Sequence, residues 1–177
     1  MELGVSISFF IALQNELTTR RLSKLNQSSR RLGGSELIAL DIDAPGADGL
    51  FNLRAIKPVD YVGATGDASL DLLGFDAEIV DTATVHFYLV NQRPPVDYQF
   101  NPIDATKTGA NATIEVFEYK RGEAEMKHLR TVFSPHVFSP NNVAAVGGGA
   151  FVVTNDRSGR VGFVSLKSQR LRCAVKS

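Results

Sequence analysis

The segment TVHFYLV, residues 84–90, is the strongest strand signal in this chain of 177 residues. After Thr84 it is apolar or aromatic except at His86, and side chains of these kinds favour a buried β-strand. The polarity then changes within two positions, because NQRPP follows at 91–95. The residues at the end of this strand are therefore the first place to look for a functional site.

Similar short apolar runs recur from about residue 36 onward, and turn residues separate them. They are LIALDID (37–43), LFNLRAI (50–56), LDLLGFDAEIVD (70–81), ATIEVFEYK (112–120), KHLRTVF (127–133) and NVAAVGGGAFVVTND (142–156). RGEAEM at 121–126 predicts a hairpin connection, and the glycines at 147–149 predict a tight turn within the last run. The stretch from 91 to 111 reads as a long polar loop. The pattern predicts an all-β fold, with a sandwich and a β-propeller as the open alternatives.

The two ends of the chain differ from this pattern. The first 30 residues or so read as helical or irregular, and LGVSISFFIAL at 3–13 is shorter than the ~20 residues that span a bilayer. A secretory signal, an amphipathic helix and a mispredicted chain start all remain open for this run, so secretion is possible and localisation is left undecided. The division expected is an N-terminal segment (1–22), a β-rich body (23–164) and a loose basic tail (165–177).

Composition excludes several classes of function. Lysine plus arginine and aspartate plus glutamate both total 19, so the balanced charge does not favour a nucleic-acid-binding protein. Basic residues cluster only near the two ends, which is typical of solvated termini. Cys173 is the single cysteine, so neither an internal disulfide nor a cysteine zinc site is expected. The sequons at Asn26 and Asn111 would carry glycans if the chain is secreted.

Candidate catalytic residues are few. We expect His86 to be packed within its strand, His128 to be exposed on an outer strand, and His136 to lie in a loop. The chain contains no G-x-S-x-G elbow for a serine nucleophile, and its acidic residues are scattered over turns, so they define no acid–base pair. A strand follows the triglycine run where a phosphate-binding loop would need Lys-Ser/Thr and a helix.

The order of several motifs resembles the paraoxonase/arylesterase family across about residues 23–164. The matching parts are LDLLGFD, FYLVNQ, ATIEVFE, HLRTV and NNVAAVGGGAFVVTND. Two further stretches, RPPVD and GANATIEVFE, resemble fungal members of the family in particular. The resemblance implies a six-bladed β-propeller that holds two calcium ions in its central tunnel. Because one blade takes about 40–45 residues, we expect an incomplete propeller of about two to three blades, truncated, with open edges available for self-association.

The resemblance also implies a set of metal ligands. Asn141 matches a ligand of the catalytic calcium, which polarises the carbonyl of the substrate. Asn142 matches an aspartate ligand of the structural calcium, and the main-chain carbonyl of Phe75 matches another ligand of that ion. Asparagine in place of aspartate removes a negative charge and weakens such a site.

Three positions that carry histidine in the family hold other residues here: Leu73, Gln92 and Arg157. Leucine cannot transfer a proton, and glutamine does not titrate near neutral pH. The expectation is thus a protein that resembles a calcium-dependent arylesterase or lactonase acting on small esters or lactones, without activity in this chain. The alternative is a degenerate propeller fragment that acts as a non-catalytic binding or interaction module.

Overall fold

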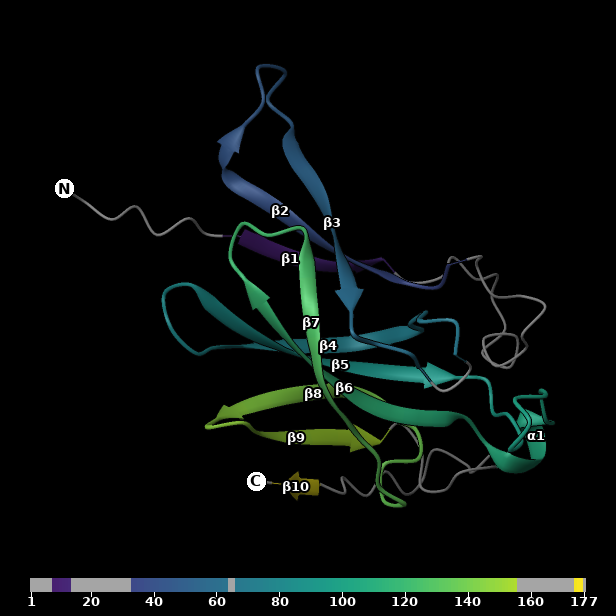
Figure 1. The fold of residues 1–177 in the computed structure, drawn as a ribbon. Coiled ribbons are helices and arrows are strands. Elements are labelled where there is room, and N and C mark those ends of the chain that lie inside the picture. The colour runs from purple at the N-terminus through teal and green to yellow at the C-terminus, as the bar shows by residue number, and fades with distance from the viewer. Residues whose placement is uncertain (1–7, 14–32, 64–65, 156–173, 177) are drawn as a thin grey trace, which may run out of the picture.

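The computed structural model describes residues 8–13, 33–63, 66–155 and 174–176 (Figure 1). These residues form two β-sheets, so the predicted all-β class is confirmed. The strands are β1 (Ser8–Leu13), β2 (Glu36–Pro45), β3 (Phe51–Val59), β4 (Leu72–Ile79), β5 (Thr84–Arg93), β6 (Asn111–Lys120), β7 (Glu125–Val132), β8 (Pro140–Gly147), β9 (Ala150–Asn155) and β10 (Ala174–Lys176). Within the described ranges one helical turn, α1 (Ala105–Thr108), interrupts them, and no helix is long and apolar enough to cross a membrane.

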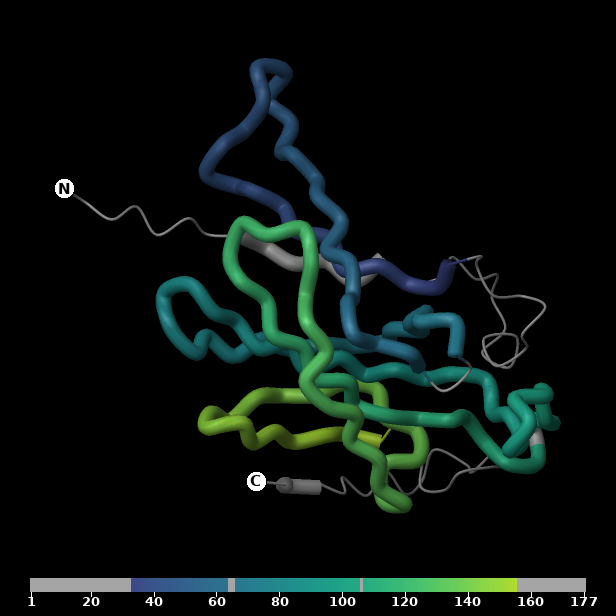
Figure 2. The backbone as a smooth tube through the Cα atoms, in the orientation of Figure 1, coloured from purple at the N-terminus to yellow at the C-terminus, as the bar shows by residue number. Residues whose placement is uncertain are grey.

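The larger sheet has seven strands in the order β1-β2-β3-β7-β6-β5-β4 (Figure 1). Its neighbours are antiparallel except β3 and β7, which run parallel over Lys57–Val59 and Glu125–Lys127. The sheet curls until its two edge strands, β1 and β4, come into contact. Just before β2, the Ser35 amide donates to the Leu70 carbonyl at 2.6 Å and joins the two ends of the curl. The result is a barrel-like wall around one core, from which the β2–β3 hairpin extends as an arm (Figure 2).

β5 is buried on both faces, which explains its nearly continuous apolar sequence. Val85, Phe87 and Leu89 point into the core enclosed by the curled sheet. Tyr88 and Val90 point the other way, into a second core between the seven-stranded sheet and the three-stranded sheet. Burying each large side chain of this kind contributes roughly 1.5–3 kcal/mol to stability.

The smaller sheet has the order β10-β9-β8 and packs its β8–β9 hairpin on β4 and β5. Val143, Phe151 and Val153 supply its buried side chains. The turn of the hairpin has φ angles of 93°, 63° and 79° at Gly147, Gly148 and Gly149. Side chains rarely tolerate this left-handed region, so three successive glycines make the turn possible and the predicted tight turn is confirmed.

The expectations for the two ends need correction where the structure describes them. Residues 8–13, expected to be helical or irregular, form strand β1 on β2, and residues 174–176 of the expected loose tail form β10 on β9. Both are short segments whose backbone groups gain partners only when a distant strand lies alongside, and a local sequence pattern does not contain that information. Asn26, Arg157 and Cys173 lie outside the described residues.

The expected polar loop from 91 to 111 is also partly wrong. β5 continues to Arg93 and pairs with β6 as far as Asn111, and α1 occupies part of the remainder. The strand can continue through Asn-Gln-Arg because each of these polar side chains finds a partner within the fold.

Candidate functional site

The end of β5 lies beside the residues that the family resemblance singles out. A bulge interrupts β4 there, because Leu72 pairs with Asn91 while Phe75 pairs with Leu89. Leu73, within the bulge, packs against the second core, and the Phe75 side chain packs against the first. A β-bulge re-aims side chains locally, and here it places Leu73 and Phe75, which are two positions apart and would share a face in a regular strand, in two different cores.

Asn141 and Asn142, at the start of β8, press directly on this bulge. A Cβ atom added to Gly74 would lie 2.5 Å from Asn142 Oδ1 and 2.7 Å from the Asn141 carbonyl oxygen. Both distances are shorter than atoms tolerate, so the contact between β4 and β8 depends on the missing side chain of Gly74. Segments nearly seventy residues apart are thereby brought together.

Gln92 completes this cluster from β5. Its amide Nε2 donates to the Pro140 carbonyl at 2.6 Å, immediately before Asn141. The structure therefore brings together the regions of Leu73, Gln92 and the asparagine pair.

The described residues do not fit a calcium centre at this place. Calcium takes six to eight oxygens, commonly with carboxylates among them. Asn142 Oδ1 already accepts the Val143 amide at 3.0 Å, and both asparagines are exposed. Among the described residues, no group of three or more His, Cys, Asp or Glu side chains is arranged to hold a metal ion. The polar groups at this place therefore act through hydrogen bonds within the fold.

Replacing Gly74 by alanine tests the contact between β4 and β8. We expect the free energy of unfolding to fall by about 1–3 kcal/mol, because the added methyl group meets backbone and a fixed amide rather than open space. Urea denaturation measures the change. Gly46→Ala is the control with the smaller expected loss, because in that exposed turn the added Cβ would lie 2.9 Å from a side-chain oxygen of Asp48 and no nearer than 3.3 Å to backbone. Equal losses in the two variants would contradict the proposed close packing.

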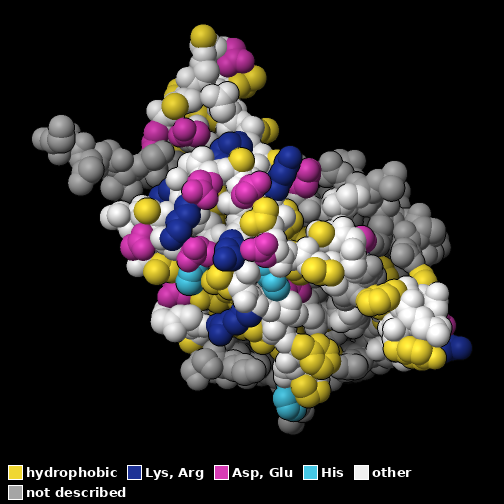
Figure 3. All heavy atoms as spheres, viewed as in Figure 1, with side chains coloured by type: hydrophobic (Ala, Val, Ile, Leu, Met, Phe, Trp, Pro, Cys, Tyr) yellow, Lys and Arg dark blue, Asp and Glu magenta, His cyan; other side chains and the backbone are white. Residues whose placement is uncertain are grey.

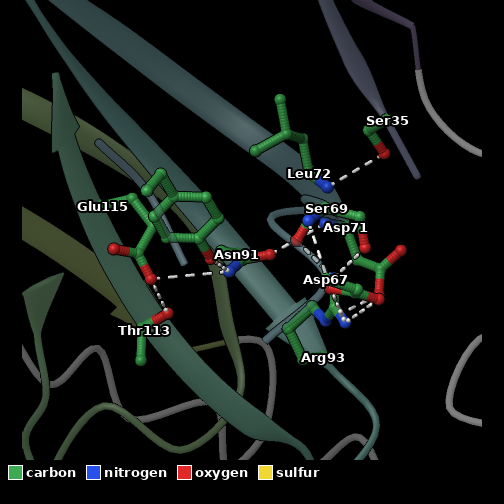
Figure 4. Close-up of polar contacts among 10 residues, drawn as sticks. Ser35, Asp67, Ser69, Asp71, Leu72, Asn91, Arg93, Thr113 and Glu115 are labelled. Atoms are coloured by element: carbon green, nitrogen blue, oxygen red, sulfur yellow. Dashed lines mark hydrogen bonds and ion pairs between the residues drawn. The ribbon is translucent and has the colours of Figure 1, made fainter. Parts of the chain in front are cut away.

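On the other face of β5, a second group of polar residues is buried in the curled sheet (Figure 4). At its centre is Glu115 of β6, which is 2 % exposed. Its Oε1 accepts the Thr113 hydroxyl at 2.6 Å, and its Oε2 accepts the Thr131 hydroxyl at 2.5 Å. Asn91 Nδ2 approaches Oε1 at 3.5 Å.

His128 belongs to this cluster, so the expectation that it is exposed is wrong. Its side chain is 16 % exposed, and Nε2 lies 3.0 Å from Glu115 Oε2. Its ring packs against Tyr61 and Phe117, with centroids 5.0 Å apart in each case. A register shift in the β6–β7 pairing sets Phe117 opposite His128 and turns the imidazole toward the core.

Asn91 connects this cluster to the next. Its Nδ2 donates to the Tyr61 hydroxyl at 3.0 Å, and its Oδ1 accepts the Asp71 amide at 2.8 Å. Burial, reinforced by the charge of Glu115, raises the pKa of Tyr61 well above its ordinary value. Tyr61 therefore stays neutral and serves as a hydrogen-bonding member of the core.

Arg93, the last residue of β5, forms the other half of the polar group (Figure 4). Its side chain is 1 % exposed, and NH2 lies 3.0 Å from both carboxylate oxygens of Asp67. NH1 donates to the carbonyl and the hydroxyl of Ser69, and Nε pairs with Asp71 Oδ2 at 3.6 Å. Two carboxylates thus neutralise one buried guanidinium.

This polar group is built for structure rather than for proton transfer. In a nucleophile–histidine–carboxylate relay the imidazole joins its two partners through different nitrogens. Here Thr131 and Glu115 both face the same atom, His128 Nε2, at 3.4 Å and 3.0 Å. The hydroxyl that would serve as nucleophile is itself bonded to the carboxylate, so the three residues form a closed hydrogen-bond cluster.

The remaining two histidines lie apart from these groups. His86 is partly buried on β5, and its Nε2 lies 3.7 Å from Glu118 Oε2 on the neighbouring strand. His136 is exposed in the connection between β7 and β8, where its carbonyl accepts Asn155 Nδ2 at 2.7 Å.

Sequence reasoning missed both Glu115 and Arg93, although one signal for Glu115 was present. Phe117 and Tyr119 belong to the enclosed core, and the two-residue period of a strand puts Glu115 on the same face. Arg93 carries the same signal, because it shares a face of β5 with Val85, Phe87 and Leu89, but its carboxylate partners lie in a different segment of the chain. No protein-family model matches this chain, and no curated protein matches it significantly.

Proposed function

We propose that this chain is a non-catalytic protein of the paraoxonase type, which acts as a binding or interaction module. The observation that carries the proposal is the hydrogen bond made by the Gln92 side chain. This position holds a histidine in the family that the chain resembles. The Gln92 amide is committed to the Pro140 carbonyl at 2.6 Å, where it ties two strands together. Leu73, at another such position, contributes to an apolar core.

The strand order supports the propeller component of this proposal. β4, β5, β6 and β7 follow one another as antiparallel neighbours, as the strands of a propeller blade do, within a sheet that β3, β2 and β1 extend to seven strands. The β8–β9 hairpin then begins a second sheet that packs on the first strands of that meander. On this proposal β4–β7 is one blade and the smaller sheet belongs to the next.

A calcium-dependent arylesterase or lactonase is the second candidate. The observation that favours it is the convergence of Gly74, Gln92, Asn141 and Asn142 on one place, as the resemblance implies. The replaced histidines and the poor fit of the described residues to calcium weigh against it.

Activity measurements with and without calcium distinguish the two candidates. We expect the purified chain to hydrolyse phenyl acetate and a γ-lactone no faster than buffer, because no described group at Gln92 or Leu73 can accept a proton. The Gln92→Ala variant is the control, and it should give the same background rate. Calorimetric titration should detect no calcium binding stronger than about 10⁻³ M. Turnover that a chelator abolishes would reject the non-catalytic proposal and support the hydrolase.

A binding or interaction module needs an exposed surface through which it contacts a partner. Self-association through open strand edges stays a prediction. The end of the β2–β3 arm carries the exposed apolar residues Leu50, Phe51 and Leu53. Figure 3 shows hydrophobic side chains, in yellow, on the projection at the top of the molecule.

A further inference from the structure

We propose that the β8–β9 hairpin is held on the larger sheet by a clasp of three side chains, Asp76, Glu78 and Gln92, which joins the two sheets without a metal ion. Each of the three reaches from β4 or β5 to a backbone group of the hairpin. These three residues together form the clasp. The clasp joins the two sheets whether or not the chain has catalytic activity.

The middle of the clasp is Asp76. Among the described strands β8 lies at the edge of its sheet, so its outward backbone groups need partners other than a strand. The Ala145 amide donates to Asp76 Oδ2 at 2.8 Å. The other oxygen, Oδ1, accepts the Ala77 amide at 2.8 Å, which fixes the direction of the carboxylate. A hydrogen bond that an ionised carboxylate accepts is stronger than a hydrogen bond between two neutral groups.

Glu78 holds the turn of the hairpin. The Gly149 amide points at both of its oxygens, at 3.4 Å and 3.3 Å. The Tyr88 hydroxyl donates to Oε2 at 2.6 Å and holds the carboxylate in place. These bonds, with that from Tyr88 the largest influence, lower the pKa of Glu78, which therefore stays ionised at neutral pH. Arg130 adds a further bond to the same turn, from NH2 to the Gly149 carbonyl at 3.1 Å.

Gln92 holds the opposite end, where β8 begins. Its bond to the Pro140 carbonyl at 2.6 Å lies beside the contact between Gly74 and the asparagine pair. The three clasp residues thus meet the hairpin at its start, its middle and its turn. Between them lies the second apolar core, in which the Tyr88 and Phe151 rings pack at a tilt of 47° with centroids 5.2 Å apart.

This arrangement does the work that the resemblance assigns to an ion. A structural cation would join β4 to the start of β8 through oxygen ligands from both. Here the carboxylates of Asp76 and Glu78 join β4 to the middle and turn of the hairpin, and the Gln92 amide joins β5 to the start of β8. Such bonds need no ion, so calcium should leave the junction unchanged.

Hydrogen exchange of the full-length chain, followed amide by amide by NMR, tests the clasp. In the Asp76→Ala/Glu78→Ala variant we expect amides of β8 and β9 to exchange roughly tenfold to a hundredfold faster, while amides of β5 and β6 keep their rates. The matched control is Glu123→Ala/Glu125→Ala, which removes two exposed carboxylates near the β6–β7 turn and should leave both groups of amides unchanged.

A second arm uses the wild-type chain and needs no variant to fold. Saturating calcium, followed by EGTA, should leave the exchange rates of β8 and β9 within twofold of each other. Strong protection by calcium, reversed by EGTA, would show that an ion joins the sheets and would overturn the proposal. Equal exchange in the clasp and control variants would overturn it as well. If the double variant fails to fold, Gln92→Ala replaces it, with faster exchange expected at the start of β8.

Discussion

Replacing Arg93 by alanine is expected to lower the free energy of unfolding by about 3–5 kcal/mol, one of the two largest losses that a single substitution outside the apolar cores should cause. The guanidinium is almost completely buried, and its removal leaves Asp71 with a carboxylate that is 10 % exposed and no longer neutralised. The carbonyl of Ser69 loses its donor at the same time. A carboxylate that is so little exposed is poorly solvated, so losing this cation either destabilises it or opens the fold locally. Urea denaturation, followed by circular dichroism, measures the loss.

Two further variants separate burial from charge. Lys107→Ala removes a cation whose side chain is 82 % exposed and whose pairing distance to Asp104 is 3.9 Å, so it should change stability by less than about 0.5 kcal/mol. Arg93→Lys keeps the charge but loses the two-pronged contact with Asp67, and it should fall between wild type and alanine. An Arg93→Ala variant as stable as Lys107→Ala would mean that Arg93 is solvated in solution.

The strands from residue 36 onward were predictable from local pattern, because each carries enough apolar residues to identify itself. TVHFYLV is the clearest case, and the structure explains its strength by burying both faces. β1 and β10 were missed because their strand character depends on pairing with β2 and β9 rather than on their own composition. Pairing across long sequence separation is the information that a single sequence shows least.

The candidate sites divide in the same way. The structure places residues near 74, 92 and 141 in contact, whereas the metal-ligand roles that the resemblance implies for this region stay predictions. The buried polar group could not be foreseen as a unit, because Arg93, Asp67 and Glu115 come from three separate segments that only the fold brings together. His128 illustrates the difference: it follows Lys127 in a strand expected to lie on the outside, which suggested exposure, and the register shift in β6–β7 turns it inward.

Glu115→Ala is the second substitution with a large expected effect, again about 3–5 kcal/mol of unfolding free energy. The carboxylate accepts bonds from Thr113 and Thr131 and faces His128, so its loss leaves several inward-facing polar groups without an acceptor. Their desolvation is then no longer offset, and truncation also opens a space beside Phe117.

Comparison with two other glutamate variants assigns this loss to the buried cluster. Glu115→Gln keeps one acceptor oxygen and should lose roughly half as much stability as alanine. Glu118→Ala changes the same residue type three positions along the same strand, where the side chain is 32 % exposed and pairs with His86 at 3.7 Å. It should cost less than about 1 kcal/mol, because partly solvated ion pairs contribute little. Denaturant titration of the three variants side by side ranks their losses of unfolding free energy. If Glu118→Ala lost as much stability as Glu115→Ala, the buried cluster would contribute no more than a partly solvated ion pair. The expected order follows from burial and from the number of donors that each carboxylate satisfies, since residue type and strand are the same.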